Sequence, residues 1–349
     1  MKSGAPNIRH LSLEELITYF EQMGEKKFRA KQVYEWIWKN GASGFEAMTN
    51  LSKELRAKLT EHFSFPALQI ETTQYSADGT IKSRFKTVDN HLVEGVLIPT
   101  ETRLTACVSS QIGCSLSCKF CATGYMDRKR NLDFDEIYDE VALINQQAER
   151  LHNKKLRNIV FMGMGEPLLN YKNVLKAVEK ITSPDGLGMS ARRITVSTAG
   201  VAKMIKQLGD DKVRFNLALS LHAATDAKRN EIMPINESNN IKALIEALNY
   251  FYEQTGNEIT LEYILFQHFN DSIKDADELI KIYRQIPVHL INVIEYNPID
   301  AAKFLKPDEE TVERFINHLS KARVNATLRR SRGKDIDAAC GQLANKDKV

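Results

Sequence analysis

Apolar positions near the amino terminus recur at helical spacing. Phe28, Val33, Trp36 and Ile37 share one face of a segment that ends at Trp38. Two more segments, one beginning at 11–15 and one spanning 51–63, follow the same period, and glycines separate the three. The pattern predicts a small helical domain over residues 1–66, whose exposed side carries lysines and arginines.

The hydrophobic period changes from helical to alternating between residues 67 and 100. Ranges 72–75, 81–88 and 92–98 alternate like strands, and Asp78-Gly79 and Asp89-Asn90 are hairpin turn signals between them. We expect a short antiparallel β meander that links the helical domain to the rest of the chain.

Strand-like and helix-like segments alternate from residue 101 to residue 330. A helix is predicted where Phe134, Ile137, Val141, Ile144 and Ala148 recur at helical spacing, with Asp133 and Glu136 as a capping box and, further on, Asn170 as a helix cap. Strands are expected at 105–110, 158–162, 193–197, 214–220, 258–265 and 290–296. Six such units predict an α/β fold with a parallel sheet and outer helices, either an open doubly wound sheet or a partial barrel.

Composition narrows the function classes. The 349 residues are 43% hydrophobic and 27% charged, which excludes a disordered chain, and no run approaches the roughly 20 apolar residues of a membrane span. The first residues lack the apolar core of a secretory signal. The net charge of +3 means that nucleic-acid binding would depend on local basic clusters. Five cysteines, three of them within eight positions, favour a metal site in the cytoplasm over a disulfide framework.

The three clustered cysteines are Cys114, Cys118 and Cys121, on one short loop after the first predicted barrel strand. Three thiolates are too few to close a structural zinc site, and they suit an iron–sulfur cluster that keeps one iron open. Two alternatives stay open: the cysteines are small buried hydrophobic residues, or they bind zinc with His222 as the fourth ligand.

This spacing, with Phe120 before the last cysteine, resembles that of the radical S-adenosylmethionine (SAM) enzymes. The resemblance implies a partial (β/α)6 barrel and a 4Fe-4S cluster whose open iron binds the amino and carboxylate groups of SAM. In such barrels chemistry collects at the carboxyl ends of the strands. The residues at those ends that the resemblance assigns to the SAM site are Gly165, Glu166, Ser197, Ser220, Leu221, His222 and Asn297.

The chemistry of these strand-end residues fits a zwitterionic ligand. Glycine lets the backbone approach it, and Glu166 can accept a hydrogen bond from its ammonium group. Ser197, Ser220 and Asn297 can bind ribose hydroxyls or the carboxylate. Each residue alone is more often structural, but all of them follow strands of the same predicted barrel.

Two further cysteines narrow the resemblance. Cys107 lies on the first predicted barrel strand, and Cys340 lies between small residues in a tail that spans 331–349. Taken alone, Cys107 is a buried strand residue and Cys340 a tail thiol. With residues 93–99 and 107–114, however, they resemble the dual-specificity radical-SAM RNA methyltransferases, which methylate carbon 2 of an adenine in 23S rRNA and in tRNA. The resemblance covers nearly the whole chain.

The resemblance also implies a mechanism that uses two SAM molecules per turnover. Cys340 takes a methyl group from the first, and the second is cleaved at the cluster to a radical that activates the S-methyl group. The resulting methylene radical adds to carbon 2 of the adenine and tethers the RNA to Cys340. Glu94 accepts the proton from carbon 2, and Cys107 then attacks the Cys340 sulfur, which releases the product and forms a disulfide that a reductant must reopen.

Partners follow from the same resemblance. They are 23S rRNA and tRNA, and an external electron donor of the flavodoxin type or similar; no membrane is involved, and the protein is expected to be a cytoplasmic monomer. Basic residues at 128–130, at 154–155 and between 329 and 334 could bind phosphate or simply face solvent. The helical domain is a candidate for gripping folded RNA around an extruded adenine.

Three other functions remain open. A sister enzyme that methylates carbon 8 of the same ribosomal adenine, an antibiotic-resistance activity, shares the cysteine set. A radical-SAM enzyme with a non-RNA substrate would make Cys107 and Cys340 incidental. A zinc-stabilised RNA-binding module would use the same cysteines without catalysis.

Overall fold

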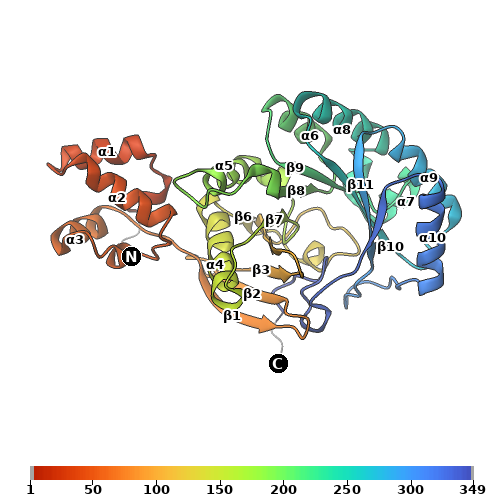
Figure 1. Cartoon of the computed structure of the whole chain (residues 1–349), viewed down its shortest axis with the longest axis horizontal. Helices are drawn as coiled ribbons and strands as arrows, with labels where there is room; N and C mark the ends of the chain where they lie inside the picture. The colour runs from red at the N-terminus through yellow and green to blue at the C-terminus, as the bar shows by residue number, and fades with distance from the viewer. Residues whose placement is uncertain (1–3, 347–349) are drawn as a thin grey trace.

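The amino-terminal helices form a unit at one side of the molecule (Figure 1). The computed structural model describes residues 4–346, so the ends of the expected first and last segments, 1–3 and 347–349, lie outside it. Helices α1 (Leu13–Gln22), α2 (Lys27–Trp38) and α3 (Lys53–His62) confirm the predicted helices. Ser12 and Glu15 form a capping box at the start of α1. The unit closes on a buried core that includes Leu16, Phe20, Val33, Leu55 and Leu59.

Arg9 attaches the helical unit to the long helix α4 (Phe134–His152). Its guanidinium donates to the two carboxylate oxygens of Asp139 at 2.7 and 2.6 Å and to the carbonyl of Pro66 at 3.1 Å. It also lies 5.1 Å from the ring centre of Trp38. Burial raises the pKa of Asp139, so the carboxylate depends on Arg9 for its charged form.

Replacing Arg9 by methionine is therefore expected to lower the free energy of unfolding by about 3–5 kcal/mol, because Asp139 is left buried without its cation. Urea unfolding followed by the fluorescence of Trp36 and Trp38 measures the change. Arg56→Met is the matched control, since Arg56 pairs with the exposed Glu46 and should cost less than about 1 kcal/mol. An equal loss in the two variants would contradict this account.

The predicted meander is confirmed as strands β1 (Gln69–Tyr75), β2 (Ile81–Lys86) and β3 (Leu92–Pro99), which pair antiparallel. It is more than a linker, however. Strand β3 also pairs antiparallel with β4 (Leu104–Cys107), with Val96 opposite Cys107, so the meander extends the sheet of the barrel. The ten strands of the sheet lie in the order β1-β2-β3-β4-β7-β8-β9-β10-β11-β12.

Parallel pairing runs from β4 to β12. The strands after β4 are β7 (Asn158–Phe161), β8 (Ile194–Thr198), β9 (Asn216–Ser220), β10 (Ile259–Leu265), β11 (Val288–Glu295) and β12 (Ala326–Arg329). The sheet has free edges at β1 and β12, which confirms a partial rather than a closed barrel. The sequence prediction missed β12, because its alternating pattern spans only four residues, too few to stand out from the flanking segments.

The first predicted barrel strand was too long. It ends at Cys107, and the chain then forms a small hairpin from β5 (Gln111–Ile112) and β6 (Arg130–Asn131). Between β4 and β5, the backbone N–H of Ser110 donates to the carbonyl of Met164 instead of to a neighbouring strand. The cysteine loop therefore leaves from a hairpin, not from a barrel strand.

Helices cover the outer side of the sheet (Figure 1). They are α4, α5 (Tyr171–Thr182), α6 (Ala202–Asp210), α7 (Asp226–Ile232), α8 (Ile241–Thr255), α9 (Ile273–Tyr283) and α10 (Glu309–Lys321). The capping box of Asp133 and Glu136 is confirmed. Asn170 is the N-cap residue of α5 as predicted, but its side chain makes no cap hydrogen bond to the helix, and its amide donates to the carbonyls of Ser110 and Leu132. Within residues 4–346, no helix combines the length and the apolarity that crossing a membrane requires.

Candidate active site

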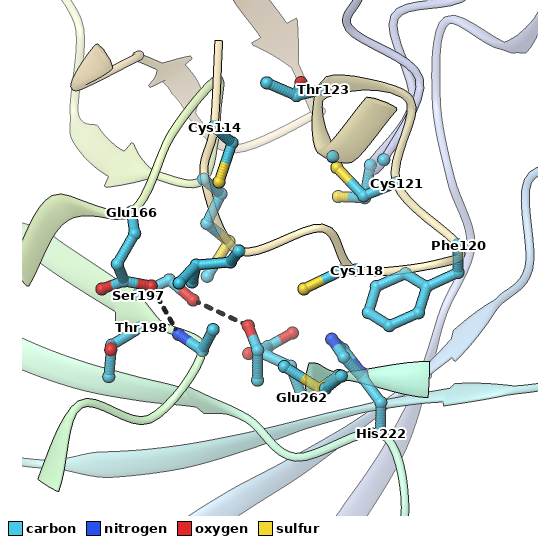
Figure 2. A pocket seen from close by; sticks show the side chains of 18 of the residues that line it. Cys114, Cys118, Phe120, Cys121, Thr123, Glu166, Ser197, Thr198, His222 and Glu262 are labelled. Atoms are coloured by element: carbon cyan, nitrogen blue, oxygen red, sulfur yellow. Dashed lines mark hydrogen bonds between the residues drawn. The ribbon is translucent and has the colours of Figure 1, made fainter. Parts of the chain in front are cut away.

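The three clustered cysteines meet at a cavity of about 150 Å³ at the carboxyl ends of the strands, which we call the upper cavity. Figure 2 shows Cys114, Cys118 and Cys121 on the loop at its wall, opposite Glu166, Ser197 and His222. Burial raises the pKa of all three thiols, that of Cys114 to about 11. All five cysteines are free, so no disulfide joins Cys107 to Cys340 in this structure.

The arrangement of the sulfurs does not suit a single zinc ion. Three thiolates on one tetrahedral zinc lie about 3.8 Å from one another. Among the described residues, the only three His, Cys, Asp or Glu side chains whose ligand atoms gather within 4.8 Å belong to His10, Asp133 and Asp135. At least one pair of cysteine sulfurs is thus farther apart, as expected when each thiolate binds a different iron of a cluster.

His222 also fits zinc poorly. Its Nδ1 accepts the backbone N–H of Ile264 at 3.2 Å, and its ring packs edge-on against Phe120 with centres 4.8 Å apart. Burial lowers its pKa to about 3, so the ring is neutral and Nε2 carries the proton. A protonated nitrogen cannot ligate a metal, and the residue instead serves as a wall of the upper cavity.

Glu166 is fixed at the end of β7 by the neighbouring backbone. One carboxylate oxygen accepts the N–H of Leu168 at 3.0 Å, and the other accepts the N–H of Ala199 at 2.7 Å, a hydrogen bond drawn in Figure 2. Burial raises the pKa of Glu166. Beside Glu166, the hydroxyls of Ser197 and Ser220 lie 3.3 Å apart at the ends of β8 and β9 (Figure 2). Together they present a carboxylate and two hydroxyls, which can bind an ammonium group and ribose oxygens.

Gly165 allows the turn that carries Glu166. Its φ is +91°, and a Cβ atom built there would lie 2.4 Å from the Cβ of Gln111. We expect Gly165→Ala to lower stability by about 2–4 kcal/mol and to displace Glu166, because both the backbone angle and the space exclude a methyl group. Thermal unfolding tests this. Gly188→Ala, at φ +61° with nothing within 4 Å, is the control for the backbone angle alone.

Two residues that the resemblance assigns to the SAM site do not line the upper cavity. Leu221 is buried, and its carbonyl accepts the Nε of Arg229 at 3.1 Å. Asn297 instead donates to the carbonyl of Cys340 at 3.2 Å and to the Ser331 hydroxyl at 2.9 Å. Asn297 thus holds the tail at Cys340, while Gly165, Ser197, Ser220 and His222 join Glu166 on the cavity wall.

Sequence analysis overlooked Arg229. The side chain is fully buried in α7 and donates to the carbonyls of Ala199 at 2.5 Å, Ser220 at 3.2 Å and Leu221. It thereby fixes the loops after β8 and β9, which carry the cavity wall. No local pattern marks this role, because its partners in these loops are backbone carbonyls, which every residue possesses.

The carboxyl-terminal tail places Cys340 beside the cysteine loop. The N–H of Ala122 donates to the carbonyl of Gly341 at 2.7 Å, and the Thr123 hydroxyl donates to the carbonyl of Leu343 at 2.6 Å. Cys340 lines both the upper cavity and a second cavity inside the barrel. Cys107 lines the second cavity, and burial together with the nearby Cys340 raises its pKa to about 12.

Glu94 lies on neither cavity wall. Its side chain is only 2% exposed, and one carboxylate oxygen accepts the N–H groups of Ala344 at 2.9 Å and Asn345 at 3.1 Å. The other oxygen lies 3.4 Å from the ammonium of Lys82, which is also buried. In this conformation Glu94 anchors the tail that carries Cys340.

Some residues of the predicted basic clusters form ion pairs within the protein, and others remain open at the surface. Arg130 is bound on both sides, by Asp89 at 2.7 Å and by Glu136 at 2.6 Å, and Lys334 pairs with Glu295. Arg329 lies at the end of β12 near Glu262, and the neighbouring Cys340 raises its pKa. Only part of the predicted positive charge is therefore open to a polyanion.

Comparisons with known proteins indicate the same kind of enzyme along most of the chain. Residues 6–65 match the family model of the ribosomal RNA large subunit methyltransferase N-terminal domain, and residues 108–280 match the radical SAM superfamily. The chain is 58% identical over 340 residues to a probable dual-specificity RNA methyltransferase RlmN of Cytophaga hutchinsonii, covering 97% of this chain and 93% of that one. The corresponding figures for the dual-specificity RNA methyltransferase RlmN 2 of Myxococcus xanthus are 44%, 97% and 91%.

A solved structure shares the whole fold. The radical SAM methyltransferase from Sphaerobacter thermophilus superposes with a TM-score of 0.91 at 39% identity, covering 97% of this chain and 99% of that one. The family implies a 4Fe-4S cluster and the use of SAM, and the three cysteines and the strand-end donors of the upper cavity fit both. The chain belongs to the RlmN family of dual-specificity radical SAM RNA methyltransferases.

Proposed function

We propose that this enzyme methylates carbon 2 of an adenine in 23S rRNA and in tRNA, through a methyl group carried by Cys340 and a covalent protein–RNA intermediate. The observation that supports this most is the position of Cys340, which lines both the upper cavity and the cavity that Cys107 lines. A sulfur there can exchange a group with a ligand on one side and react with a second thiol on the other.

The upper cavity supplies the sites for the cofactors. Cys114, Cys118 and Cys121 would hold the cluster, which supplies the electron that cleaves SAM. Glu166 would orient the ammonium group of SAM, and Ser197 and Ser220 its ribose hydroxyls. The apolar side chains of Phe120, Met233 and Ile264 on the same wall keep water from the reacting groups.

The tail and the first barrel strand carry the covalent chemistry. The Cys340 sulfur takes a methyl group by displacement, and the carbon of that group later forms the bond to carbon 2 of the RNA base. Glu94 accepts the proton from carbon 2, which requires that Ala344 and Asn345 first release its carboxylate. The Cys107 thiolate then attacks the Cys340 sulfur, and the pKa of about 12 means that Cys107 needs a base or a rearrangement before it becomes a nucleophile.

We propose that each turnover uses two SAM molecules and an external electron donor. We also propose that the enzyme is a cytoplasmic monomer. A monomer suffices because the sites for the methyl carrier and for cleavage both lie within one chain. Incubating the enzyme with SAM, a reductant and unmodified 23S rRNA or tRNA, followed by mass spectrometry of the nucleosides, tests the function. The expected product is 2-methyladenosine. Exclusive formation of 8-methyladenosine would show the sister activity, and no methylated adenosine in either RNA would reject the proposal.

A further inference from the structure

Glu140 is a buried acidic side chain on α4 that the proposed mechanism does not use. It is fully buried, and one carboxyl oxygen accepts the backbone N–H of Ser109 at 2.7 Å. The other oxygen is buried without a hydrogen-bond partner among the described residues. Burying an acid in this way costs free energy, and an apolar side chain would pack there at a lower cost. The presence of Glu140 therefore needs an explanation other than packing.

The bond from Glu140 to Ser109 replaces a missing strand partner. Strand β4 ends at Cys107, and its pairing with β7 ends at the same residue. Two residues later, the N–H of Ser109 donates to α4 instead, through the Glu140 carboxyl group. Buried backbone N–H groups are nearly always paired, so Glu140 supplies the acceptor that the sheet no longer offers.

Ser109 in turn joins two other segments. Its hydroxyl donates to the backbone carbonyl of Glu94 on β3 and accepts the N–H of Met164 after β7, both at 2.7 Å. The N–H of Glu94 also donates to the Met164 sulfur at 3.4 Å. There is no spare room, because a Cβ atom on Gly163 would lie 2.6 Å from the Ser109 hydroxyl oxygen. We call this meeting point of α4, β3 and the turn after β7 the Ser109 junction.

Both segments held by the Ser109 junction carry groups of the proposed reaction. The Glu94 carboxylate accepts two backbone N–H groups of the tail that carries Cys340. Met164 lies two residues before Glu166, on the turn that presents Glu166 to the upper cavity. A shift of the junction would therefore change the position of the tail relative to the SAM-binding wall.

We propose that Glu140 is a positioning residue, which acts through Ser109 to fix the tail anchor Glu94 relative to the turn that carries Glu166. The inference rests on the proposed function, which gives Glu94 and Glu166 their roles. Glu140 itself lines neither the upper cavity nor the second cavity, so it acts without touching substrate or cofactor. Such positioning matters because a misplacement of about 1 Å can cost about a hundredfold in rate.

Glu140 fills this role as a neutral carboxylic acid. Burial raises the pKa of Glu140 well above its usual value, even though the Ser109 N–H favours the charged form. The carbonyl oxygen of a neutral acid still accepts an N–H group, so the contact needs no charge. Glutamine offers the same acceptor on a side chain of the same length, whereas leucine offers none.

The test compares Glu140→Gln with Glu140→Leu in the full-length enzyme. Gln147→Leu is the matched control, because Gln147 is also buried on α4, about two turns further on. Its amide donates to the Ser83 hydroxyl at 2.8 Å, on strand β2, which carries no active-site residue. Ser109→Ala breaks the Ser109 junction by removing only a hydroxyl, so it tests the proposal even if Glu140→Leu does not fold.

Hydrogen exchange followed by mass spectrometry measures the Ser109 junction independently of activity. Peptides spanning 108–112, 162–168 and 339–345 should exchange at least about tenfold faster in Glu140→Leu and Ser109→Ala, and at the unmodified rate in Glu140→Gln and Gln147→Leu. In Glu140→Leu and Ser109→Ala, the SAM concentration that half-saturates S-methylation of Cys340 should rise at least about fivefold, and RNA methylation should fall at least about tenfold. Glu140→Gln should retain the activity and the pH profile of the unmodified enzyme.

Two results would overturn the proposal. Equal exchange and equal SAM dependence in Glu140→Leu and Gln147→Leu would reduce Glu140 to ordinary packing. Loss of RNA methylation in Glu140→Gln, or a shifted pH profile, would show that the charge of the carboxylate takes part. Failure of the proposed function looks different, because the unmodified enzyme would then make no 2-methyladenosine while the exchange differences among the variants would remain.

Discussion

Cys340→Ala is expected to abolish methylation of RNA while leaving the iron–sulfur cluster intact. The variant removes the thiol that is proposed to carry the methyl group and that lines both cavities, so the methyl group has no carrier. Cys340 makes its tail contacts through its backbone carbonyl, which alanine retains. The measurement is nucleoside mass spectrometry, combined with an iron assay that should find about four irons per chain.

Cys107→Ala is the matched control for this prediction. It keeps the methyl carrier and removes the thiol that is proposed to release the product, so RNA covalently bound to the protein should accumulate. Gel electrophoresis under denaturing conditions detects that species. Methylated RNA from the Cys340→Ala variant at an unchanged rate would rule out Cys340 as the carrier.

Glu94→Ala is expected to reduce RNA methylation at least about a hundredfold, and it should also lower S-methylation of Cys340. The substitution leaves the N–H groups of Ala344 and Asn345 without their acceptor, and it removes the carboxylate that pairs with the buried Lys82 ammonium. The tail that presents Cys340 would then lose its fixed position. Intact-protein mass spectrometry measures the S-methyl group, and nucleoside analysis measures the product.

Glu94→Gln separates anchoring from proton transfer. The glutamine carbonyl can still accept the two tail N–H groups, so S-methylation of Cys340 should recover, but a neutral amide cannot take the proton from carbon 2. Glu101→Gln, exposed in the turn between β3 and β4, should behave like the unmodified enzyme. Normal S-methylation in Glu94→Ala would show that Glu94 has no anchoring role.

The helical amino-terminal unit, the meander and most parallel strands were predictable because each depends on short-range periodicity. The features that the sequence did not show lack such periodicity or carry too little of it. Strand β12 is only four residues long, the chain after Cys107 leaves the sheet early, and the amide of Asn170, the N-cap residue of α5, donates to distant carbonyls. In each case tertiary partners outweighed the local preference.

The residues of the candidate site also fall into those that local spacing indicates and those that only tertiary contacts bring into place. The spacing of Cys114, Cys118 and Cys121 is a local property, and the sequence alone indicated an iron–sulfur cluster with an open position. Glu94 shows the limit of that reasoning, since its partners are backbone groups about 250 residues away. A contact to a backbone N–H group does not depend on which side chain the partner carries, so no sequence motif indicates it.

By itself, the sequence determined the candidate chemistry: three cysteines on one loop, two more cysteines outside it, and polar residues after successive strands. Only the tertiary structure decided which of these groups face one another. It placed Cys340 on the walls of two cavities and brought Asn297 and Glu94 into contact with the tail. The physical reason is that chain order sets the local spacing of ligands, whereas the closure of the sheet and the return of the tail set the contacts between distant segments.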